Sequence, residues 1–287
     1  MKSPRKTGIL LLTCPDRKGL VAAVSDFVVR HGGNIVHADQ HTDREARVFV
    51  QRVEFELDGL DLARDEIAPT FSPIAKQLGM DWRLRFSDEP RRVAILVSKL
   101  GHCLCDLISR WRMGELRAEI PLVISNHDEM RPVAEEVGIE FHHLPVDKTT
   151  RPEQERKILE LLREAKIDLV VLARYMQILS NGMVDAYPDK IINIHHSFLP
   201  AFAGARPYHR AHDRGVKVIG ATAHYVTAEL DEGPIIEQDV VRVSHRNSVA
   251  DMIRKGRDLE KTVLARAVAL HLANRVVIYG HKTAVFD

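Results

Sequence analysis

The feature that most constrains this fold is the alternation of short apolar runs with amphipathic segments after residue 93. Apolar runs of strand length occur at residues 93–98, 121–125, 141–144, 169–172, 191–193, 218–225 and 235–243. Segments with helical periodicity occur at residues 104–112, 130–137, 152–165 and 248–279. Because strands that alternate with helices form a parallel sheet covered on both faces, this pattern predicts a Rossmann-like α/β domain with a mostly parallel sheet. Functional groups of such domains lie at the carboxyl ends of the strands.

The first 86 residues follow a different order, which is strand, helix, strand, strand, helix and strand. These six elements are expected at residues 8–13, 20–28, 35–41, 47–57, 60–78 and 82–86. The βαββαβ order is typical of a ferredoxin-like sandwich. The polar segment 87–92 contains Pro90, so we expect it to be a linker between domains at residues 1–86 and 93–287.

Charge balance and cysteine content narrow the class of ligand. The 287 residues include 41 Lys and Arg against 40 Asp and Glu, so no strong field attracts nucleic acid or an anionic membrane. The three cysteines, Cys14, Cys103 and Cys105, are too few for a disulfide framework and favour a reducing cytoplasm. No apolar stretch reaches the roughly 18 residues that span a membrane. A small molecule is therefore the expected ligand, with neither nucleic acid nor membrane as partner.

Polar residues that suit catalysis follow the apolar run at residues 191–192. Asn193 and His195 are two positions apart in an extended segment, so both side chains point to the same side. An amide can donate to an oxygen that becomes negative, and an imidazole can carry a proton near neutral pH. The alternative is that both residues only satisfy hydrogen bonds at the end of a strand.

A second polar stretch follows the expected strand 218–225. Its short acidic loop contains Asp231 and is followed by Gly233-Pro234, after which a strand pattern resumes. A carboxylate in this loop could return beside His195, orient the ring and stabilise its charged form. Alternatively, Asp231 is a solvated turn residue.

These two stretches together resemble the signature of the folate-dependent formyltransferase family, over residues 91–287. The matching motifs are Asn193-Ile194-His195-x-Ser197-x-Leu199-Pro200 and Thr222-x-His224-x-Val226-x-x-x-Leu230-Asp231-x-Gly233-Pro234-Ile235-Ile236. The resemblance implies a catalytic trio of Asn193, His195 and Asp231. It also implies a folate-binding segment at 173–179 and a closing loop at 226–231. The folate-binding residues would be Met176, Gln177, Ile178, Leu179, Val226 and Leu230. Simple core packing is the alternative for Met176, Ile178 and Leu179.

One departure from that signature concerns the acceptor of the formyl group. Relatives that formylate glycinamide ribonucleotide carry a Gly-Ser-Asn phosphate cradle after the first strand, whereas here Lys99-Leu100-Gly101-His102-Cys103 follows Ser98. One glycine makes a poor nest of backbone donors for a phosphate. Two stretches, Gly101-His102-Cys103-Leu104 and Pro200-Ala201-Phe202-x-Gly204-Ala205-Arg206-Pro207-Tyr208-His209, instead resemble the formyltetrahydrofolate deformylase family. That family transfers the formyl group to water, and His102 and Cys103 are expected on the acceptor side of the pocket.

The N-terminal domain resembles an ACT domain, a module that binds amino acids. The matching stretches are Cys14-Pro15-Asp16-Arg17-Lys18-Gly19-Leu20 and Gly32-Gly33-Asn34-Ile35. The resemblance implies an amino-acid effector, for which we expect glycine or methionine, near Asp16, Gly19 and Asn34, and it implies a homo-oligomer. The alternatives are that these stretches only begin and end a helix, or that the domain persists only as a dimerisation surface.

The expected function is hydrolysis of 10-formyltetrahydrofolate to formate and tetrahydrofolate, with no permanently bound cofactor and no metal. Two other functions remain open: formyl transfer to an amine acceptor, and an amino-acid-binding module with an inactive catalytic half. Two other chemistries are open as well. A metal could use His209 and His212, or the pairs His195-His196 and His142-His143. Cys103 or Cys105 could be a nucleophile with His102 as base.

Overall fold

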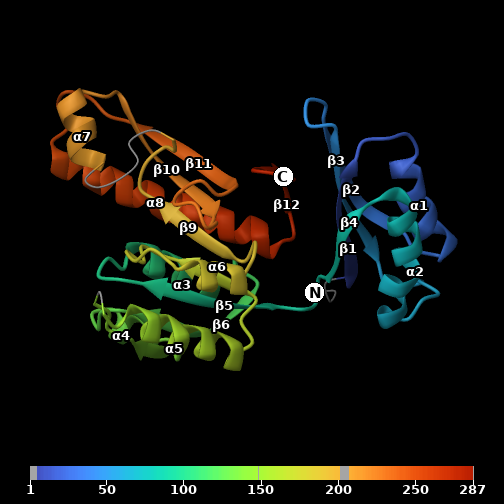
Figure 1. The fold of residues 1–287 in the computed structure, drawn as a ribbon, viewed down its shortest axis with the longest axis horizontal. Coiled ribbons are helices and arrows are strands. Elements are labelled where there is room, and N and C mark those ends of the chain that lie inside the picture. The colour runs from blue at the N-terminus through green and yellow to red at the C-terminus, as the bar shows by residue number, and fades with distance from the viewer. Residues whose placement is uncertain (1–4, 148, 201–206, 287) are drawn as a thin grey trace. The chain divides into compact units, whose positions relative to one another are not determined.

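The computed structural model describes residues 5–147, 149–200 and 207–286 (Figure 1). The chain forms two compact units, one made of Met1–Pro90 with Ala273–Asp287 and the other of Arg91–Leu272. The division falls within the expected linker 87–92, but the end of the chain belongs to the first unit rather than to the second domain. Within the described ranges, no helix combines the length and apolarity needed to cross a membrane.

The first unit contains a four-stranded antiparallel sheet in the order β2-β3-β1-β4. Its strands are β1 (Thr7–Pro15), β2 (Ile35–Asp43), β3 (Val48–Glu56) and β4 (Asp81–Phe86), and its helices are α1 (Leu20–Arg30) and α2 (Arg64–Leu78). Alternate residues of β1 point to opposite faces, so Leu10 and Leu12 join the helix-covered core with Phe71, whereas Ile9 and Leu11 face away from it. The predicted βαββαβ arrangement is confirmed.

A C-terminal hairpin covers the other face of this sheet. Strands β12 (Val276–Tyr279) and β13 (Lys282–Val285) bring Val277, Ala284 and Phe286 against Ile9 and Leu11. The expected helix through residue 279 is therefore wrong at its end, since α8 (Val249–Leu272) stops earlier. Asn274 adopts the left-handed conformation with φ 53, which ends the helical path, and the apolar, largely β-branched run after it forms a strand.

The second unit contains a seven-stranded sheet in the order β11-β10-β9-β8-β5-β6-β7. Its strands are β5 (Arg91–Val97), β6 (Ala118–Ser125), β7 (Glu140–His143), β8 (Leu169–Leu172), β9 (Ile191–His195), β10 (Val218–Tyr225) and β11 (Ile235–Arg242). The strands from β5 to β9 are parallel, and β10 and β11 run antiparallel to their neighbours. The prediction of a mostly parallel sheet is confirmed.

The remaining helices connect these strands. They are α3 (His102–Arg112), α4 (Arg131–Glu135), α5 (Arg151–Glu164), α6 (Asn181–Ala186) and α7 (Pro207–Arg214). The chain builds β5, β6 and β7 in one direction and then returns to the other side of β5 with β8 and β9. The strand order therefore reverses between β5 and β8, and ligand crevices of open α/β sheets lie at the carboxyl ends of such neighbours.

Candidate active site

Asn193 and His195 lie at the carboxyl end of β9, where β10 fixes their register. Asn193 pairs with His224 and His195 pairs with Thr222 across these two strands. Asn193 is half-buried and His195 is buried, and both line the same cavity. The period-two spacing of a strand predicts that these two side chains point to the same side, and in the structure both line one cavity.

Asp231 reaches the same cavity from the loop between β10 and β11. Its Oδ1 lies 3.2 Å from Nδ1 of His195. The nearby His195, and after it His224, hold the pKa of the Asp231 carboxyl well below its usual range, so the group is a carboxylate at neutral pH. Since a carboxylate only accepts, Nδ1 of His195 carries the proton of this pair.

The other ring nitrogen of His195 has no hydrogen-bond partner in the part of the chain that the structure describes. Nε2 is buried and makes no hydrogen bond to any described residue. A buried polar atom without a partner carries a desolvation cost, which a bound substrate or water can relieve. With Nδ1 held by Asp231, Nε2 is the atom at which His195 can gain or lose a proton.

His224 also belongs to this group, although no role of its own is predicted for it from the sequence. Its Nδ1 donates to the carbonyl oxygen of Tyr225 at 2.9 Å. Its Nε2 lies 3.3 Å from Nδ2 of Asn193 and 3.7 Å from Oδ1 of Asp231. Neutral His224 therefore accepts from the Asn193 amide, and protonated His224 faces the Asp231 carboxylate. The signal for this role was its period-two spacing from Thr222 on a strand beside Asn193.

A cavity of about 430 Å³ opens beside these polar groups. The six expected folate-binding residues all line it, namely Met176, Gln177, Ile178, Leu179, Val226 and Leu230. Met176, Ile178 and Leu230 are large apolar side chains that remain more than half exposed. Core packing therefore does not explain Met176 and Ile178, whereas Leu179 and Val226 do pack against the core of this unit. The cavity therefore has an apolar wall and, at one end, the polar side chains described above.

Hydrogen bonds to Ser98 shape the wall at residues 174–179. The hydroxyl of Ser98 accepts from the backbone N–H of Met176 at 3.1 Å and donates to Oδ1 of Asn126 at 2.7 Å. The N–H of Ser98 donates to the carbonyl of Arg174, which has the left-handed φ of 64. The end of β5 thus holds the turn that follows β8.

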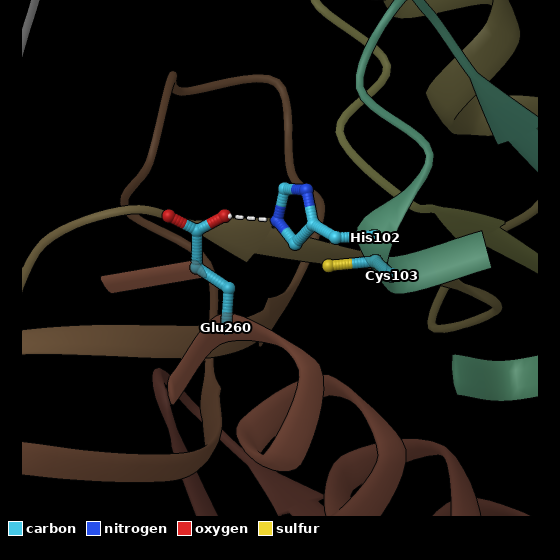
Figure 2. A group of neighbouring side chains, drawn as sticks. All are labelled: His102, Cys103 and Glu260. Atoms are coloured by element: carbon cyan, nitrogen blue, oxygen red, sulfur yellow. Dashed lines mark hydrogen bonds and ion pairs between the residues drawn. The ribbon is translucent and has the colours of Figure 1, made fainter. Parts of the chain in front are cut away.

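The expected acceptor-side residues, His102 and Cys103, do not line this cavity. Figure 2 shows them at the start of α3, directed toward Glu260 of α8, with Nε2 of His102 2.7 Å from Oε2 of Glu260. Cys103 is fully buried, and burial followed by the charge of Glu260 raises the pKa of its thiol far above the ordinary value. A neutral, enclosed thiol is a poor nucleophile, so the geometry opposes that role for Cys103.

These three residues also bear on metal binding. In the part of the chain that the structure describes, His102, Cys103 and Glu260 are the one group of three or more potential ligands whose atoms lie within 4.8 Å of one another. The histidine pairs and His209-x-x-His212 do not form such a group there. Tyr208 donates to Oε1 of Glu260 at 2.6 Å, so hydrogen bonds already occupy both carboxylate oxygens.

The expected effector residues do not meet within one chain. Asp16 and Gly19 lie in the turn before α1, and Gly19 has φ 91. Asn34 lies beyond the other end of α1, where Nδ2 donates to Oε2 of Glu56 at 3.0 Å. The 11 residues of α1 separate the two ends by about 16 Å.

The motif that begins at Pro200 lies partly outside the described residues, since residues 201–206 are not among them.

Comparison with known proteins gives consistent matches to both units. The family described as Formyl transferase matches residues 91–268, and the family described as ACT domain matches residues 8–68. A formyltetrahydrofolate deformylase of Synechocystis sp. is 58% identical over 98% of each chain. The crystal structure of a formyltetrahydrofolate deformylase from Pseudomonas syringae pv. tomato has a TM-score of 0.97 and 48% identity, covering 100% of this chain and 96% of that one. Glycinamide ribonucleotide transformylase 1 from Symbiobacterium toebii has a TM-score of 0.66 and 33% identity, covering 71% and 98%.

Proposed function

This chain belongs to the formyltetrahydrofolate deformylase family, and on that premise we propose that Asn193, His195 and Asp231 hydrolyse the formyl group of 10-formyltetrahydrofolate. The observation that carries the assignment is the buried Nε2 of His195, which has no partner among residues 5–147, 149–200 and 207–286 and belongs to a side chain that lines the same cavity as the Asn193 amide. The products are formate and tetrahydrofolate.

Asn193 acts on the oxygen of the formyl group. That group is an amide on N10, so attack by water places negative charge on its carbonyl oxygen. The Asn193 amide has two N–H donors, of which neutral His224 accepts one at 3.3 Å, leaving the other for this oxygen. The hydrogen bond to His224 also fixes the orientation of the amide before substrate binds.

His195 moves the proton that hydrolysis requires. Neutral His195 accepts a proton from the attacking water at Nε2 while the water oxygen bonds to the formyl carbon. The resulting imidazolium is stabilised by Asp231, 3.2 Å from Nδ1. The same Nε2–H then donates to N10 as the carbon–nitrogen bond breaks. Each proton removed from water is thus returned to the leaving nitrogen.

The apolar wall suits the ring system of a folate. Met176, Ile178 and Leu230 offer exposed apolar surface, and the residues of the 174–179 turn line the same cavity. These contacts hold the formyl carbon near the trio and supply the positioning part of the rate enhancement. The proposed reaction takes no permanently bound cofactor.

The test is incubation of the purified protein with 10-formyltetrahydrofolate alone, with free formate measured over time. We expect formate release by the wild type and a loss of about 10²–10³ in rate for Asn193→Ala, the usual cost of one oxyanion donor. Asn181→Ala, at an exposed helix position, is the matched control and should keep the wild-type rate. An unchanged rate in Asn193→Ala contradicts the assignment.

Product analysis separates hydrolysis from formyl transfer. Adding glycinamide ribonucleotide should neither consume formyl groups nor change the products. Formylated ribonucleotide would instead identify a transferase, and folate binding with no formate release would indicate an inactive catalytic half.

The ACT domain supports a proposal about regulation. We propose that it binds a small amino acid, glycine or methionine, with Asp16 and Gly19 at one end of α1 and Asn34 at the other. Since these ends lie about 16 Å apart, one amino acid bridges them only across two copies of the chain in a homo-oligomer. Calorimetry with each amino acid tests this, and no heat with either removes the proposal.

The free cysteines, of which Cys105 is exposed, support a reducing cytoplasm as the location of the protein.

A further inference from the structure

The folate wall, defined as residues 175–179, lies in an irregular segment between β8 and α6. All five of its residues line the cavity that contains Asn193 and His195. Because the backbone of such a segment is not held by a regular helix or strand, its conformation depends on hydrogen bonds from the elements around it. Ser98 of the β5 end supplies one of them, since its hydroxyl accepts from the N–H of Met176 at 3.1 Å. Helix α5 supplies others.

Two consecutive polar residues near the start of α5 are buried. Gln154 is 5% exposed and Glu155 is 9% exposed. Both lie on the side of the helix that also places Ile158 and Leu162 in the core of this unit. Glutamate is almost never buried without a partner, since taking its charge out of water is costly. The partners of these two side chains therefore show what their burial is for.

Glu155 binds the end of the folate wall. Its Oε1 accepts from the backbone N–H of Ser180 at 2.9 Å and lies 3.6 Å from Nε of Arg151. Ser180 is the N-cap of α6, and its own hydroxyl accepts from the N–H of Met183 at 3.3 Å. Since Ser180 directly follows Leu179, the carboxylate fixes the wall where it joins α6. A hydrogen bond to a charged acceptor is about twice as strong as one between neutral groups.

Gln154 binds the start of the folate wall. Its Nε2 donates to the carbonyl oxygen of Leu144 at 2.5 Å, and its Oε1 accepts from the Tyr175 hydroxyl at 3.4 Å. Burial, followed by the charge of Glu155, raises the pKa of Tyr175 to about 12, so the hydroxyl remains a donor at neutral pH. Consecutive residues of α5 thus hold both ends of the wall.

We propose that Glu155 is a positioning residue for folate binding, which holds the wall in the shape that receives the substrate. This inference rests on the proposed function. Met176 and Ile178 lie between the two contacts with α5 and keep more than half of their surface exposed. Because core packing does not fix these two side chains, the contacts on either side determine where their apolar surface lies. Glu155 itself does not line the cavity, so it acts on the substrate only through the wall.

The position of the wall predicts an effect on binding rather than on chemistry. In the proposed complex the wall contacts the ring system, so its contacts are alike in the bound substrate and in the transition state. Losing such contacts raises KM and leaves kcat nearly unchanged. Loss of folded protein would instead lower the apparent kcat at an unchanged KM. This difference separates a positioning role from a general structural one.

The experiment measures kcat and KM for 10-formyltetrahydrofolate in Glu155→Ala, in which the N–H of Ser180 loses its acceptor. We expect KM to rise at least about tenfold, with kcat within about threefold of the wild type. A folded Glu155→Ala protein with the wild-type KM overturns the proposal.

Two further variants control for charge and for folding. Glu155→Gln keeps an acceptor oxygen of the same reach, so its KM should return to within about threefold of the wild type. Glu160→Ala is the matched control, because Glu160 is an exposed residue of the same helix and pairs with Arg156. It should keep both constants. An equal rise of KM in Glu160→Ala would mean that α5 responds to any lost carboxylate, and would overturn the proposal.

Glu155→Asp takes the place of Glu155→Ala if the latter does not fold. It keeps the charge but withdraws the oxygen from Ser180 by one methylene, so KM should still rise at least about threefold. An unchanged KM in this variant then overturns the proposal.

Calorimetry with tetrahydrofolate measures the wall without turnover. The folded alanine or aspartate variant should bind tetrahydrofolate more weakly than the wild type by the same factor as its KM rises. Equal affinities, or no binding by the wild type, overturn the proposal. Weaker binding by the variant supports it even if the wild type releases no formate, so a failure of this inference is distinguishable from a failure of the proposed hydrolysis.

Discussion

The carboxylate of Asp231 lies 3.2 Å from Nδ1 of His195, and Asp231 reaches this position with the left-handed φ of 60. Such a conformation is uncommon for residues other than glycine, although aspartate tolerates it better than most. The loop after β10 therefore accepts local strain and directs its carboxylate to the ring. The strain is balanced by the charged hydrogen bond that the carboxylate receives.

Asp231→Asn tests the importance of this pair. An amide of the same size can present its N–H to Nδ1 and so stabilise the wrong tautomer, with the proton on Nε2. Comparable changes in a carboxylate–histidine pair lower kcat by about 10⁴. Formate release by the variant should fall by about 10³–10⁴, as measured at substrate saturation.

Glu232→Gln provides the control for that substitution, since Glu232 is the exposed next residue and does not line the cavity. It should keep the wild-type rate. Equal losses in both variants would mean that the loop responds to any change of charge, and would contradict a specific role for Asp231.

The neutral state of His196 predicts a pH dependence of stability. Burial, followed by the nearby Arg174 and His195, lowers the pKa of His196 from 6.5 to about 4. The unfolded chain therefore binds more protons than the folded chain between these values. The free energy of unfolding rises with pH through this window and falls as the pH decreases. From pH 7 to pH 5 this one group should cost about 2 kcal/mol of stability.

Urea unfolding at the two pH values measures this effect. In His196→Gln the unfolding free energy should depend less on pH, by about the same 2 kcal/mol, because the variant has no ring to protonate. An identical pH dependence in wild type and variant would mean that His196 is not the group responsible.

The sequence predicted the parallel sheet and the placement of Asn193 and His195 because both depend on local periodicity. Strand length, alternation and the following polar residues are all visible within a few positions. The predicted end of the last helix was wrong because the apolar run after Asn274 fits a helical pattern as well as it fits a strand. Only its packing against Ile9 and Leu11 decides between them, and that packing is not local.

The partners of Glu260 were not predictable for the same reason. A single glutamate on an amphipathic helix usually faces solvent, and His102 lies 158 residues away. The resemblance to known families supplied the role of Asp231, whereas the residues alone left it as either an active-site carboxylate or a turn residue. The part of the site that depends on contacts between distant segments of the chain therefore cannot be predicted from local sequence patterns.

The C-terminal hairpin should contribute to the stability of the first unit. Phe286 is 4% exposed and packs in the cluster that covers Ile9 and Leu11. Phe286→Ala removes a buried ring and should lower the free energy of unfolding of this unit by about 3 kcal/mol. The denaturation midpoint in urea measures the loss. Val29→Ala, at an exposed position of α1, is the control and should change stability by less than about 0.5 kcal/mol.

Gly233 holds the loop that carries Asp231 close to the end of β10. A Cβ at this position would lie 1.8 Å from the carbonyl oxygen of Tyr225, which is backbone and cannot move aside as a flexible side chain can. The N–H of Tyr225 also donates to the carbonyl of Pro234 at 2.9 Å, so a shift of the loop breaks this hydrogen bond. Gly233→Ala should therefore displace Asp231 from His195 and reduce formate release by at least about tenfold, since a displacement near 1 Å is costly in a catalytic pair.

The contrasting substitution is Gly182→Ala in α6. A Cβ at Gly182 would meet only the Ser180 hydroxyl at 3.9 Å, and alanine favours a helix by about 0.5–1 kcal/mol over glycine. This variant should keep its activity and unfold at the same or a slightly higher temperature. Measuring both variants by formate release and thermal unfolding separates a local displacement of Asp231 from a general effect of adding a methyl group. Wild-type activity in folded Gly233→Ala would mean that the loop can carry its carboxylate to His195 without this close approach.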